Sequence, residues 1–422
     1  MNPRRRDLLR AIGTESSRTR RRGRTVVTAT VVVAAAMVGC AGTGERGTLM
    51  AIRNSDGEVL WEHRIEPNPT QVLSEGDVVI AAGVHGCDGD GRIVAVDALT
   101  GEEKWSAPFE GGFSQSTSTD DLVVTSARGG VVARRLDDGT QQWRSDRFGD
   151  AQLQVAAGAD TVVIGANDPG SAPLDAPRIV AVDAATGETR WVTSLDGLGG
   201  TVDVAVVSDV VVIRAYEPGA IDVGRTTIVA LGLADGAIRW LQSLGVSDVL
   251  PPLLVSADAV VVETAIYESI ADGATEELPP SSSVVILETD TGMLRWRIDR
   301  GVDLDDPGHS GVAAHALSDV AVVGRIGSEL IAWNVLNGDQ LWSATSRGGG
   351  GGGVGGGAWV AGDRVLASTP PQPGDGQGLL EALTLATGEE QWSQEGPGEI
   401  AAAAATVDVS FVATWGSGNG CG

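Results

Sequence analysis

The chain has 422 residues, with 30 basic and 56 acidic side chains and a formal net charge of −26. An acidic surface of this kind repels phosphate backbones, which argues against a nucleic-acid-binding protein. Aromatic residues make up only 4% of the chain, so its core must consist mainly of Val, Ile and Leu together with the 11 tryptophans.

Residues 1–40 differ sharply from the rest of the chain. They contain nine arginines and two acidic residues, and their apolar run, residues 25–39, ends at Cys40. A basic region followed by a short apolar core and small residues is typical of an export signal. The run is also short for a membrane-spanning helix. Residues 41–422 then hold 21 basic and 54 acidic side chains, a net charge near −33 for the exported body.

The end of this segment indicates how the protein is anchored. Residues 37–40 read Met-Val-Gly-Cys, which resembles a bacterial lipobox with methionine in place of the usual leucine. The motif predicts lipidation of Cys40 and a location on the outer side of the cytoplasmic membrane. An uncleaved signal anchor is the alternative. Residues 5–9 read Arg-Arg-Asp-Leu-Leu, so both a twin-arginine and a general export route stay open.

From residue 48 onward, eight tryptophans each stand four residues after a glycine that follows Asp, Thr or Asn. Successive members lie 38 to 56 residues apart, and a period of this size indicates a repeat architecture. The eight residues are Trp61, Trp105, Trp143, Trp191, Trp240, Trp296, Trp342 and Trp392.

Each repeat predicts four strands, here named A to D. An apolar, often β-branched run precedes the glycine turn and the tryptophan follows it, which predicts a C–D hairpin. Ten residues before the tryptophan stands an alanine in seven repeats and Ile286 in the eighth. An aspartate leads the apolar strand B and suits the A–B turn, because its carboxylate can accept nearby backbone N–H bonds. These aspartates are Asp77, Asp121, Asp160, Asp209, Asp258, Asp319, Asp363 and Asp408.

The chain ends determine the number of repeats. Residues 48–64 supply only strands C and D, and residues 400–414 supply only strands A and B, with seven complete units between them. The two halves together make an eighth unit. The sequence therefore predicts an all-β, eight-bladed β-propeller of four-stranded blades, formed by residues 41–422 as one domain and closed by its N- and C-terminal strands.

Two repeats carry a family resemblance most clearly. Residues 95–105 and 181–191 both read Ala-Val-Asp-Ala-x-Thr-Gly-x-x-x-Trp. This resembles the PQQ-like, quinoprotein-type propeller repeat. In that family the repeated tryptophans dock neighbouring blades, so the resemblance implies a structural role for all eight of them. A large flat apolar side chain suits that role.

Three cysteines occur in the chain. If Cys40 is lipidated, Cys87 and Cys421 remain in an oxidising compartment. Cys87 follows strand B of the first complete blade, and Cys421 follows strand B of the closing blade beside it. We expect a Cys87–Cys421 disulfide that fastens the C-terminus, with pairing to Cys40 as an alternative if lipidation fails.

The connections between strands vary unevenly. The A–B and C–D turns are short, whereas some B–C and D–A connections are long, and both kinds of connection emerge on one face of a propeller. Elaborated loops on a rigid scaffold usually carry function, so we expect the binding site there. The long connections are residues 167–177, 217–225, 268–283, 303–309, 348–357 and 369–378.

Specific chemistry on these loops is sparse. Residues 88–90 and 303–306 contain carboxylates that could hold Ca²⁺, but neither has a complete calcium-loop spacing. His309 and His315 lack a third metal ligand. We therefore expect no metal site and assign no catalytic residue.

Three hypotheses on the function follow. The preferred one is a non-catalytic, membrane-anchored binding or scaffold module, monomeric and without a cofactor, that contacts a protein or cell-envelope partner. The second is a PQQ- and calcium-dependent dehydrogenase. Alcohol-oxidising members of that family carry adjacent cysteines, and this chain has none. They also carry a stacking tryptophan, a role for which Trp333, Trp359 and Trp415 are candidates because they lie outside the repeat position. The third hypothesis is that the chain is related to outer-membrane assembly lipoproteins, which share the eight-bladed form and lipid anchor.

Overall fold

The computed structural model describes most of the chain from residue 47 onward. The described residues are 32–33, 47–66, 68–84, 91–109, 113–127, 130–149, 151–167, 177–217, 225–246, 253–266, 281–301, 312–326, 329–345, 357–369, 378–396 and 400–414. All regular structure in these ranges is β-strand. They contain no helix long and apolar enough to cross a membrane.

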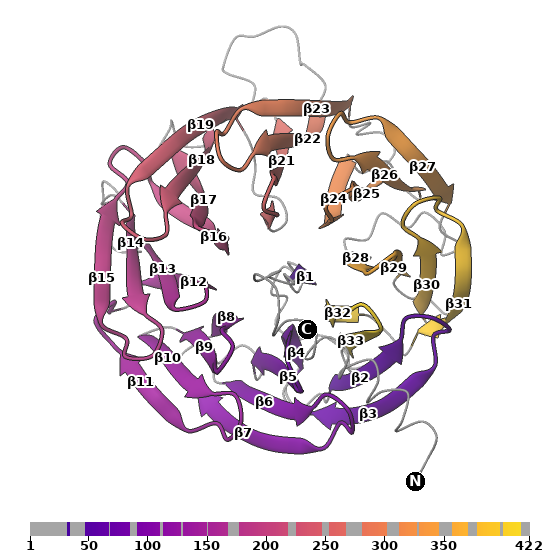
Figure 1. Ribbon diagram of the computed structural model, residues 1–422, viewed down its shortest axis with the longest axis horizontal. Coiled ribbons are helices and arrows are strands. Elements are labelled where there is room, and N and C mark those ends of the chain that lie inside the picture. Colours follow the sequence, from indigo (N-terminus) through magenta and orange to yellow (C-terminus); the bar gives the residue numbers. More distant parts are fainter. Residues whose placement is uncertain are drawn as a thin grey trace, which may run out of the picture. The chain divides into compact units, whose positions relative to one another are not determined.

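The fold is an eight-bladed β-propeller, as the repeats predict (Figure 1). Every blade is an antiparallel sheet with its strands in the order A, B, C, D, and in blades 1 to 7 this is also their order in the sequence. The closing blade, blade 8, combines the two C-terminal strands with the first two strands of the body, as expected from the chain ends. The predicted closure between residues 48–64 and 400–414 is therefore confirmed.

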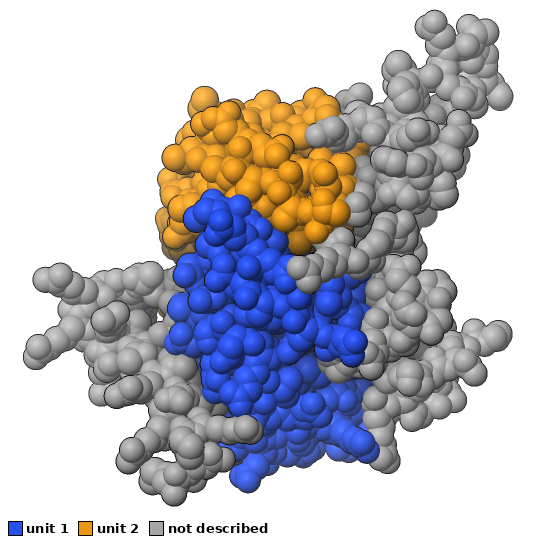
Figure 2. Space-filling model, turned by 90° about the vertical axis from the view of Figure 1, so that its right-hand side faces the viewer, with its two compact units in different colours: residues 1–127, 132–142, 353–422 blue, residues 128–131, 143–352 orange. Residues whose placement is uncertain are grey.

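The chain divides into two compact units (Figure 2). Unit 1 comprises residues 1–127, 132–142 and 353–422. It holds blades 8, 1 and 7, and most of blade 2. Their strands are β32 (Ile400–Ala405), β33 (Val409–Thr414), β2 (Gly47–Arg53) and β3 (Val59–Ile65) in blade 8; β4 (Pro69–Glu75), β5 (Val78–Val84), β6 (Gly91–Asp97) and β7 (Glu103–Phe109) in blade 1; β8 (Phe113–Ser118), β9 (Leu122–Ala127), β10 (Gly130–Arg135) and β11 (Gln141–Ser145) in blade 2; and β28 (Ala358–Ala361), β29 (Arg364–Thr369), β30 (Gly378–Thr384) and β31 (Glu390–Gly396) in blade 7.

Unit 2 comprises residues 128–131 and 143–352 and holds blades 3 to 6 together with the remainder of blade 2, including Trp143. Its strands are β12 (Gln152–Ala157), β13 (Thr161–Asn167), β14 (Arg178–Asp183) and β15 (Thr189–Ser194) in blade 3; β16 (Gly200–Val207), β17 (Val210–Glu217), β18 (Arg225–Gly232) and β19 (Ile238–Val246) in blade 4; β20 (Leu254–Val255), β21 (Ala259–Ile266), β22 (Ser281–Glu288) and β23 (Leu294–Gly301) in blade 5; and β24 (Val312–Leu317), β25 (Ala321–Ile326), β26 (Glu329–Asn334) and β27 (Gln340–Thr345) in blade 6.

Blade 8 carries one additional strand. β1 (Val32–Val33), from the apolar run of the N-terminal segment, pairs antiparallel with β32 through Val32↔Ala403 and Val33↔Ala402. This strand pairs the edge of β32, which otherwise presents an exposed row of backbone groups. It lies in the predicted export segment, so lipoprotein processing at Cys40 would remove it.

The alanine and the tryptophan of each repeat lie directly opposite each other. Ala95 pairs with Trp105 across the β6–β7 ladder, and the register shifts by a bulge immediately after Ala95. The same pairing and bulge occur in the other described C–D registers, including Ile286 opposite Trp296. The small residue leaves space beside the indole, which explains why alanine recurs ten residues before the tryptophan.

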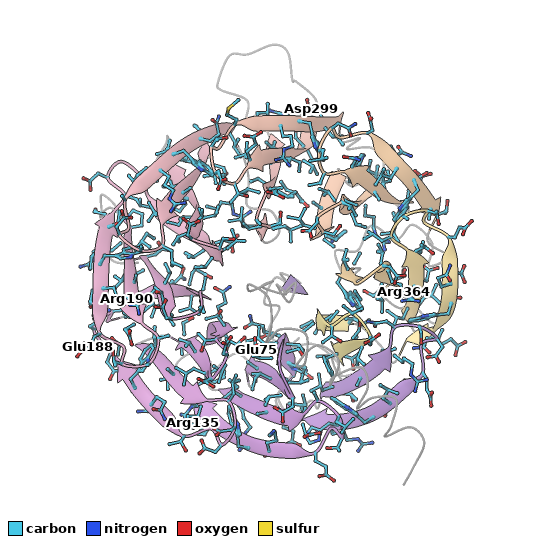
Figure 3. All side chains as sticks on the ribbon, viewed as in Figure 1. Glu75, Arg135, Glu188, Arg190, Asp299 and Arg364 are labelled. Atoms are coloured by element: carbon cyan, nitrogen blue, oxygen red, sulfur yellow. The ribbon has the colours of Figure 1, made fainter. Side chains whose placement is uncertain are left out.

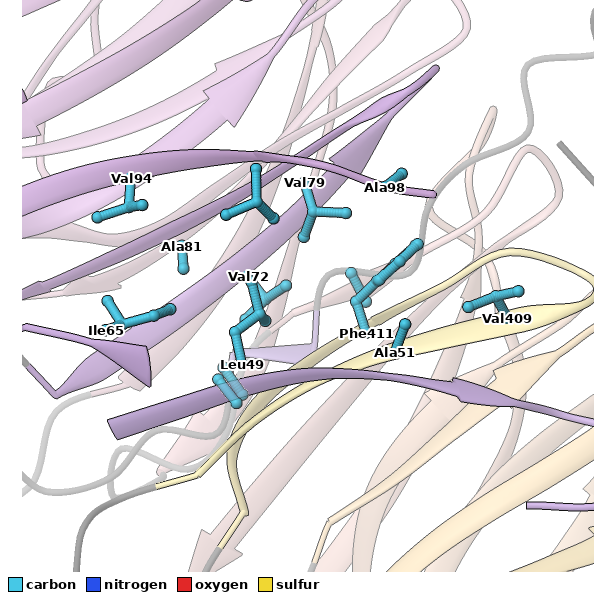
Figure 4. Close-up of a cluster of buried hydrophobic side chains, with 14 residues drawn as sticks. Leu49, Ala51, Ile65, Val72, Val79, Ala81, Val94, Ala98, Val409 and Phe411 are labelled. Atoms are coloured by element: carbon cyan, nitrogen blue, oxygen red, sulfur yellow. The ribbon is translucent and has the colours of Figure 1, made fainter. Parts of the chain in front are cut away.

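Among the described residues, the core consists of apolar clusters between adjacent blades. One cluster joins blade 8 to blade 1 and includes Leu49, Val72, Val79 and Phe411 (Figure 4). All four side chains are fully buried. Phe411 lies 6.0 Å from the ring of Trp61, measured between centroids. Because strands B and C are buried on both faces, they read as nearly continuous apolar runs.

Candidate functional site

The repeat tryptophans lie between blades. The indole N–H of Trp105 in blade 1 donates to the carbonyl of Leu136 in blade 2 at 2.8 Å. Seven tryptophans make this bond to the next blade of their own unit, at 2.7–3.0 Å. The pairs are Trp61–Ala98, Trp105–Leu136, Trp143–Ala184, Trp191–Leu233, Trp240–Thr289, Trp296–Val335 and Trp392–Asn54. These seven tryptophans thus pack between blades as the repeat implies, and the eighth, Trp342, is buried.

The repeat glycine contacts the tryptophan of the preceding blade, not that of its own repeat. Gly139 has φ +71°, and a Cβ built on it would lie 2.6 Å from the Trp105 ring. Corresponding approaches occur at Gly57, Gly101, Gly187, Gly236, Gly292 and Gly338. Glycine is needed here both for its backbone angle and for the space that its missing side chain leaves.

Two of the three tryptophans outside the repeat position are packing residues. Trp333 is buried in the core between blades 5 and 6. Trp359 is 1% exposed, and its indole N–H donates to the Ser410 hydroxyl at 3.1 Å. Trp415 lies outside the described residues. Neither Trp333 nor Trp359 is therefore an exposed stacking platform.

Each blade has two distinct ends. We call the end with the A–B and C–D turns the turn end, and the end from which B–C and D–A connections leave the loop end. The elaborated connections predicted to carry function join strands at the loop end, although most of their residues lie outside the described ranges. The strand residues just beneath them are described and form the candidate site.

Charge is unevenly distributed at the loop end of strand B. The fifth residue of strand B is uncharged in five blades and charged in three consecutive blades of unit 2, where Arg214, Glu263 and Arg325 alternate in sign. The uncharged residues are Ala82, Ser126, Gly165, Ser368 and Ala413. Arg214 and Glu263 are buried, at 5% and 6% exposure, and Arg325 is half-buried.

In blade 4 the buried charge is neutralised by its cross-strand neighbour. Asp203 of β16 stands opposite Arg214 of β17, and their side chains form a close ion pair. Leu253 of the next blade donates its backbone N–H to Asp203 at 3.4 Å. Burial raises the pKa of Asp203, while Arg214 and the Leu253 amide act in the opposite direction.

In blade 5 the carboxyl group has a weaker set of partners. Glu263 accepts a hydrogen bond from the backbone N–H of Ala314 in blade 6. Burial raises the pKa of Glu263 to about 8, against smaller opposing effects of the Ala314 amide and the charge of Arg214. The group is therefore mostly protonated at neutral pH.

His315 lies beside this contact on β24. Burial lowers the pKa of His315 to about 4, and the positive charge of Arg325 adds to the effect. The imidazole is thus neutral near pH 7. Within the described part of the chain, no group of three or more His, Cys, Asp or Glu side chains that could hold a metal occurs.

Several predicted residues cannot be placed. Cys40, Cys87 and Cys421 lie outside the described residues, as do His309 and the acidic stretches 88–90 and 303–306. The predicted lipidation and disulfide, and the expectation that the acidic stretches hold no metal, therefore stay predictions.

Sequence reasoning missed the buried polar groups at the loop end. A signal was present, since Arg214, Glu263 and Arg325 interrupt otherwise apolar valine-rich strands at the same strand position. A charged residue inside such a run needs a buried partner, and only the three-dimensional arrangement identifies it.

The sequence matches a family model described as outer membrane protein assembly factor BamB, over residues 12–145, 175–352 and 280–419. It is also similar to a quinoprotein ethanol dehydrogenase from Pseudomonas aeruginosa, with 26% identity over 34% of this chain and 29% of that enzyme. The chain thus spans less than a third of the length of that dehydrogenase.

Solved structures resemble the fold at low sequence identity. BamB from Moraxella catarrhalis has a TM-score of 0.51 and 15% identity, over 82% of this chain and 96% of that one. Apo AztD from Citrobacter koseri has a TM-score of 0.53 and 10% identity, over 89% and 99%. Quinohemoprotein alcohol dehydrogenase from Comamonas testosteroni has a TM-score of 0.51 and 12% identity, over 91% and 77%. These likenesses show the fold alone.

Proposed function

Because the chain belongs to the PQQ-like propeller family whose model is described as outer membrane protein assembly factor BamB, we propose that it is a non-catalytic binding or scaffold module. It acts outside the cytoplasmic membrane, and its partner is a protein of the cell envelope. The partner contacts the loop end of the blades.

One observation carries this proposal. The repeated tryptophans are occupied in blade-to-blade packing, whereas the variation in length is concentrated in connections at the loop end. Loops of variable length at one end of a rigid scaffold are typical of a surface that binds a partner. The match to BamB, an assembly factor by its description, adds to the case for a protein partner.

Attachment to the membrane is part of the proposal. The basic segment, the short apolar run and Cys40 together favour export and lipidation, with the body on the outer side of the membrane. Metabolic labelling with a fatty-acid analogue tests this. Wild-type protein should incorporate the label and Cys40→Ala should not, and label on the variant would contradict lipidation at Cys40.

Site-specific photo-crosslinking in native membranes tests the binding role. A photoreactive residue at Arg178 or Glu329, both exposed at the loop end, should capture a partner. Matched probes at Leu336 and Val407, which are 66% and 48% exposed at the turn end, should not capture it. Capture only from the turn end, or from neither end, would contradict the proposal.

The second candidate function is a PQQ- and calcium-dependent dehydrogenase, favoured by the similarity to the Pseudomonas aeruginosa enzyme. Reconstitution of the purified protein with PQQ and Ca²⁺, followed by absorbance and dye-reduction assays with alcohols, distinguishes the two functions. The binding-module proposal expects neither stoichiometric cofactor binding nor turnover. Stoichiometric binding with turnover would replace it by the enzymatic one.

A further inference from the structure

Neighbouring blades are connected at the loop end by a recurring contact between a side chain and a backbone amide. In unit 1, the Gln71 side chain of blade 1 holds the backbone of Ser116 in blade 2. Gln71 donates to the Ser116 carbonyl at 2.8 Å and accepts from the Ser116 N–H at 2.6 Å. In unit 2, Glu263 of blade 5 accepts from the N–H of Ala314 in blade 6.

The two amides occupy equivalent positions. Ser116 pairs with Thr125, and Ala314 pairs with Gly324, and both partners are the fourth residue of strand B. The same strand-A position is therefore held by the preceding blade in both places. The two holding side chains come from different strands, Gln71 from strand A (β4) and Glu263 from strand B (β21). They also differ in chemistry: the carboxamide of Gln71 cannot change its charge, whereas the carboxyl group of Glu263 can.

The surroundings of Glu263 provide little compensation for a negative charge. Its side chain is 6% exposed. Arg214 of β17 is the cation that acts on it, and Arg214 is already in a close ion pair with Asp203. From blade 6, His315 and Arg325 lie on β24 and β25, and the imidazole of His315 is neutral near pH 7. An ionised Glu263 would thus be a buried charge without a dedicated cation.

We propose that the contact between Glu263 and the Ala314 amide is a proton-controlled connection between β21 and β24. When Glu263 is protonated, the carboxyl group is compatible with the buried interface and its oxygen accepts the Ala314 N–H. When it is ionised, local opening of the interface becomes more favourable because water can then solvate the carboxylate. The connection controls how firmly the start of β24, which follows the D–A connection of residues 302–311, is held at the loop end.

The direction of the pH dependence follows from linkage. The pKa of Glu263 is raised to about 8 in the closed state, so the closed state binds more protons than the open one from the ordinary glutamate range up to about pH 8. Within that window, each increase of one pH unit should raise the equilibrium constant for local opening about tenfold. The effect should level off above about pH 8. His315 does not contribute there, because its pKa is lowered to about 4.

Hydrogen exchange of the full chain, read by mass spectrometry from pH 6 to pH 9 and corrected for intrinsic exchange rates, tests the proposal. The protection of residues 312–317 should fall with pH in the wild type and stay constant in Glu263→Gln. Residues 113–118 serve as the internal control and should show constant protection in both proteins. Equal pH dependence of residues 312–317 in wild type and Glu263→Gln would overturn the proposal.

A reciprocal variant keeps the test decisive if Glu263→Gln folds poorly. Gln71→Glu places a titratable group at the corresponding contact of unit 1. Residues 113–118 should then acquire the pH-dependent loss of protection, while residues 312–317 behave as in the wild type. Failure of residues 113–118 to respond would contradict the mechanism. Because exchange is measured without a partner, this test is independent of the proposed binding function.

Discussion

The indole N–H of Trp105 and the carbonyl of Leu136 are joined by a hydrogen bond of 2.8 Å that connects blade 1 to blade 2. The N–H of Leu136 in turn donates to the carbonyl of Asp121 at 2.9 Å. The backbone of one residue, Leu136, therefore accepts a hydrogen bond from the repeat tryptophan of the preceding blade and donates one to the repeat aspartate of its own blade. The same relationship connects Trp191, Leu233 and Asp209 in unit 2.

Replacing Trp105 should show how much one such connection contributes. Trp105→Phe retains most of the ring but removes the N–H donor, and should lower the free energy of unfolding by about 1 kcal/mol or more, since the Leu136 carbonyl loses its partner. Trp105→Ala also removes the buried ring and should cost about 3–5 kcal/mol. Urea unfolding followed by circular dichroism measures both. Equal losses in the two variants would show that the hydrogen bond, not the packing, dominates.

Gly139 should tolerate no side chain, for two separable reasons. Its φ is +71°, and a Cβ would lie 2.6 Å from the Trp105 ring. Gly139→Ala should therefore lower the unfolding free energy through both backbone strain, about 1–2 kcal/mol, and a steric clash. Gly76→Ala is the matched control, because Gly76 has φ +59° and open space around it. Thermal unfolding should show a larger loss for Gly139→Ala, and equal losses would mean that the ring contact is unimportant.

Much of the fold could be predicted from the sequence, because the repeat residues act at fixed positions. The Gly139 turn and the strand bearing Trp143 are local features, so their spacing along the chain reveals them. The pairing of Gly139 with Trp105 of the preceding repeat is not local, and spacing alone does not distinguish it from pairing with Trp143. Glu263 and Ala314 are 51 residues apart, so their contact depends on how two blades pack.

The side chain of Arg190, which is labelled in Figure 3, forms ion pairs with two aspartates of blade 3. Its guanidinium lies 3.1 Å from Asp160 and 2.8 Å from Asp183, and it is the main cause of the lowered pKa of both carboxyl groups. Because the pKa of both carboxyl groups is lowered in the folded state, their ion pairs with Arg190 stabilise the fold above the ordinary aspartate range. This stabilisation is lost as the pH falls through the folded-state pKa values. These groups are partly exposed, so the contribution is at most about 1 kcal/mol.

Arg190→Gln should therefore raise the pKa of Asp160 and Asp183 with little change in stability at pH 7. Carbon-detected NMR titration of aspartate-labelled protein measures the shifts. Arg239→Gln is the matched control, because Arg239 pairs with Asp209 at 2.7 Å in the next blade. That variant should raise the pKa of Asp209 and leave the pKa of Asp160 unchanged. Unchanged titration of Asp160 in Arg190→Gln would contradict the assignment of the ion pair.

His315 should make the protein sensitive to acid. Its folded-state pKa is lowered to about 4, so the unfolded chain binds an additional proton between about pH 6.5 and pH 4, and stability is lost as the pH falls through that range. The loss from this group is at most about 3 kcal/mol. Urea unfolding at pH 7 and pH 4.5 should show a smaller acid-induced loss in His315→Gln than in the wild type. His63→Gln controls for removal of a histidine and should match the wild type.

The predicted disulfide between Cys87 and Cys421 can be tested without reference to function. Cys87 follows β5, and Cys421 follows β33, seven residues beyond its last residue, Thr414. A cross-link there would fasten the end of the chain to blade 1 and should stabilise the protein by about 2–4 kcal/mol by restricting the unfolded chain.

A non-reducing peptide map of the exported protein should show one peptide pair joined through Cys87 and Cys421. Cys87→Ser and Cys421→Ser should lower the unfolding free energy equally, and the double variant should lose no more than either single one, because each removes the same bond. Cys40→Ser should leave that bond intact and remove only the lipid. Free thiols at both positions, or a bond from either of them to Cys40, would contradict the predicted pairing.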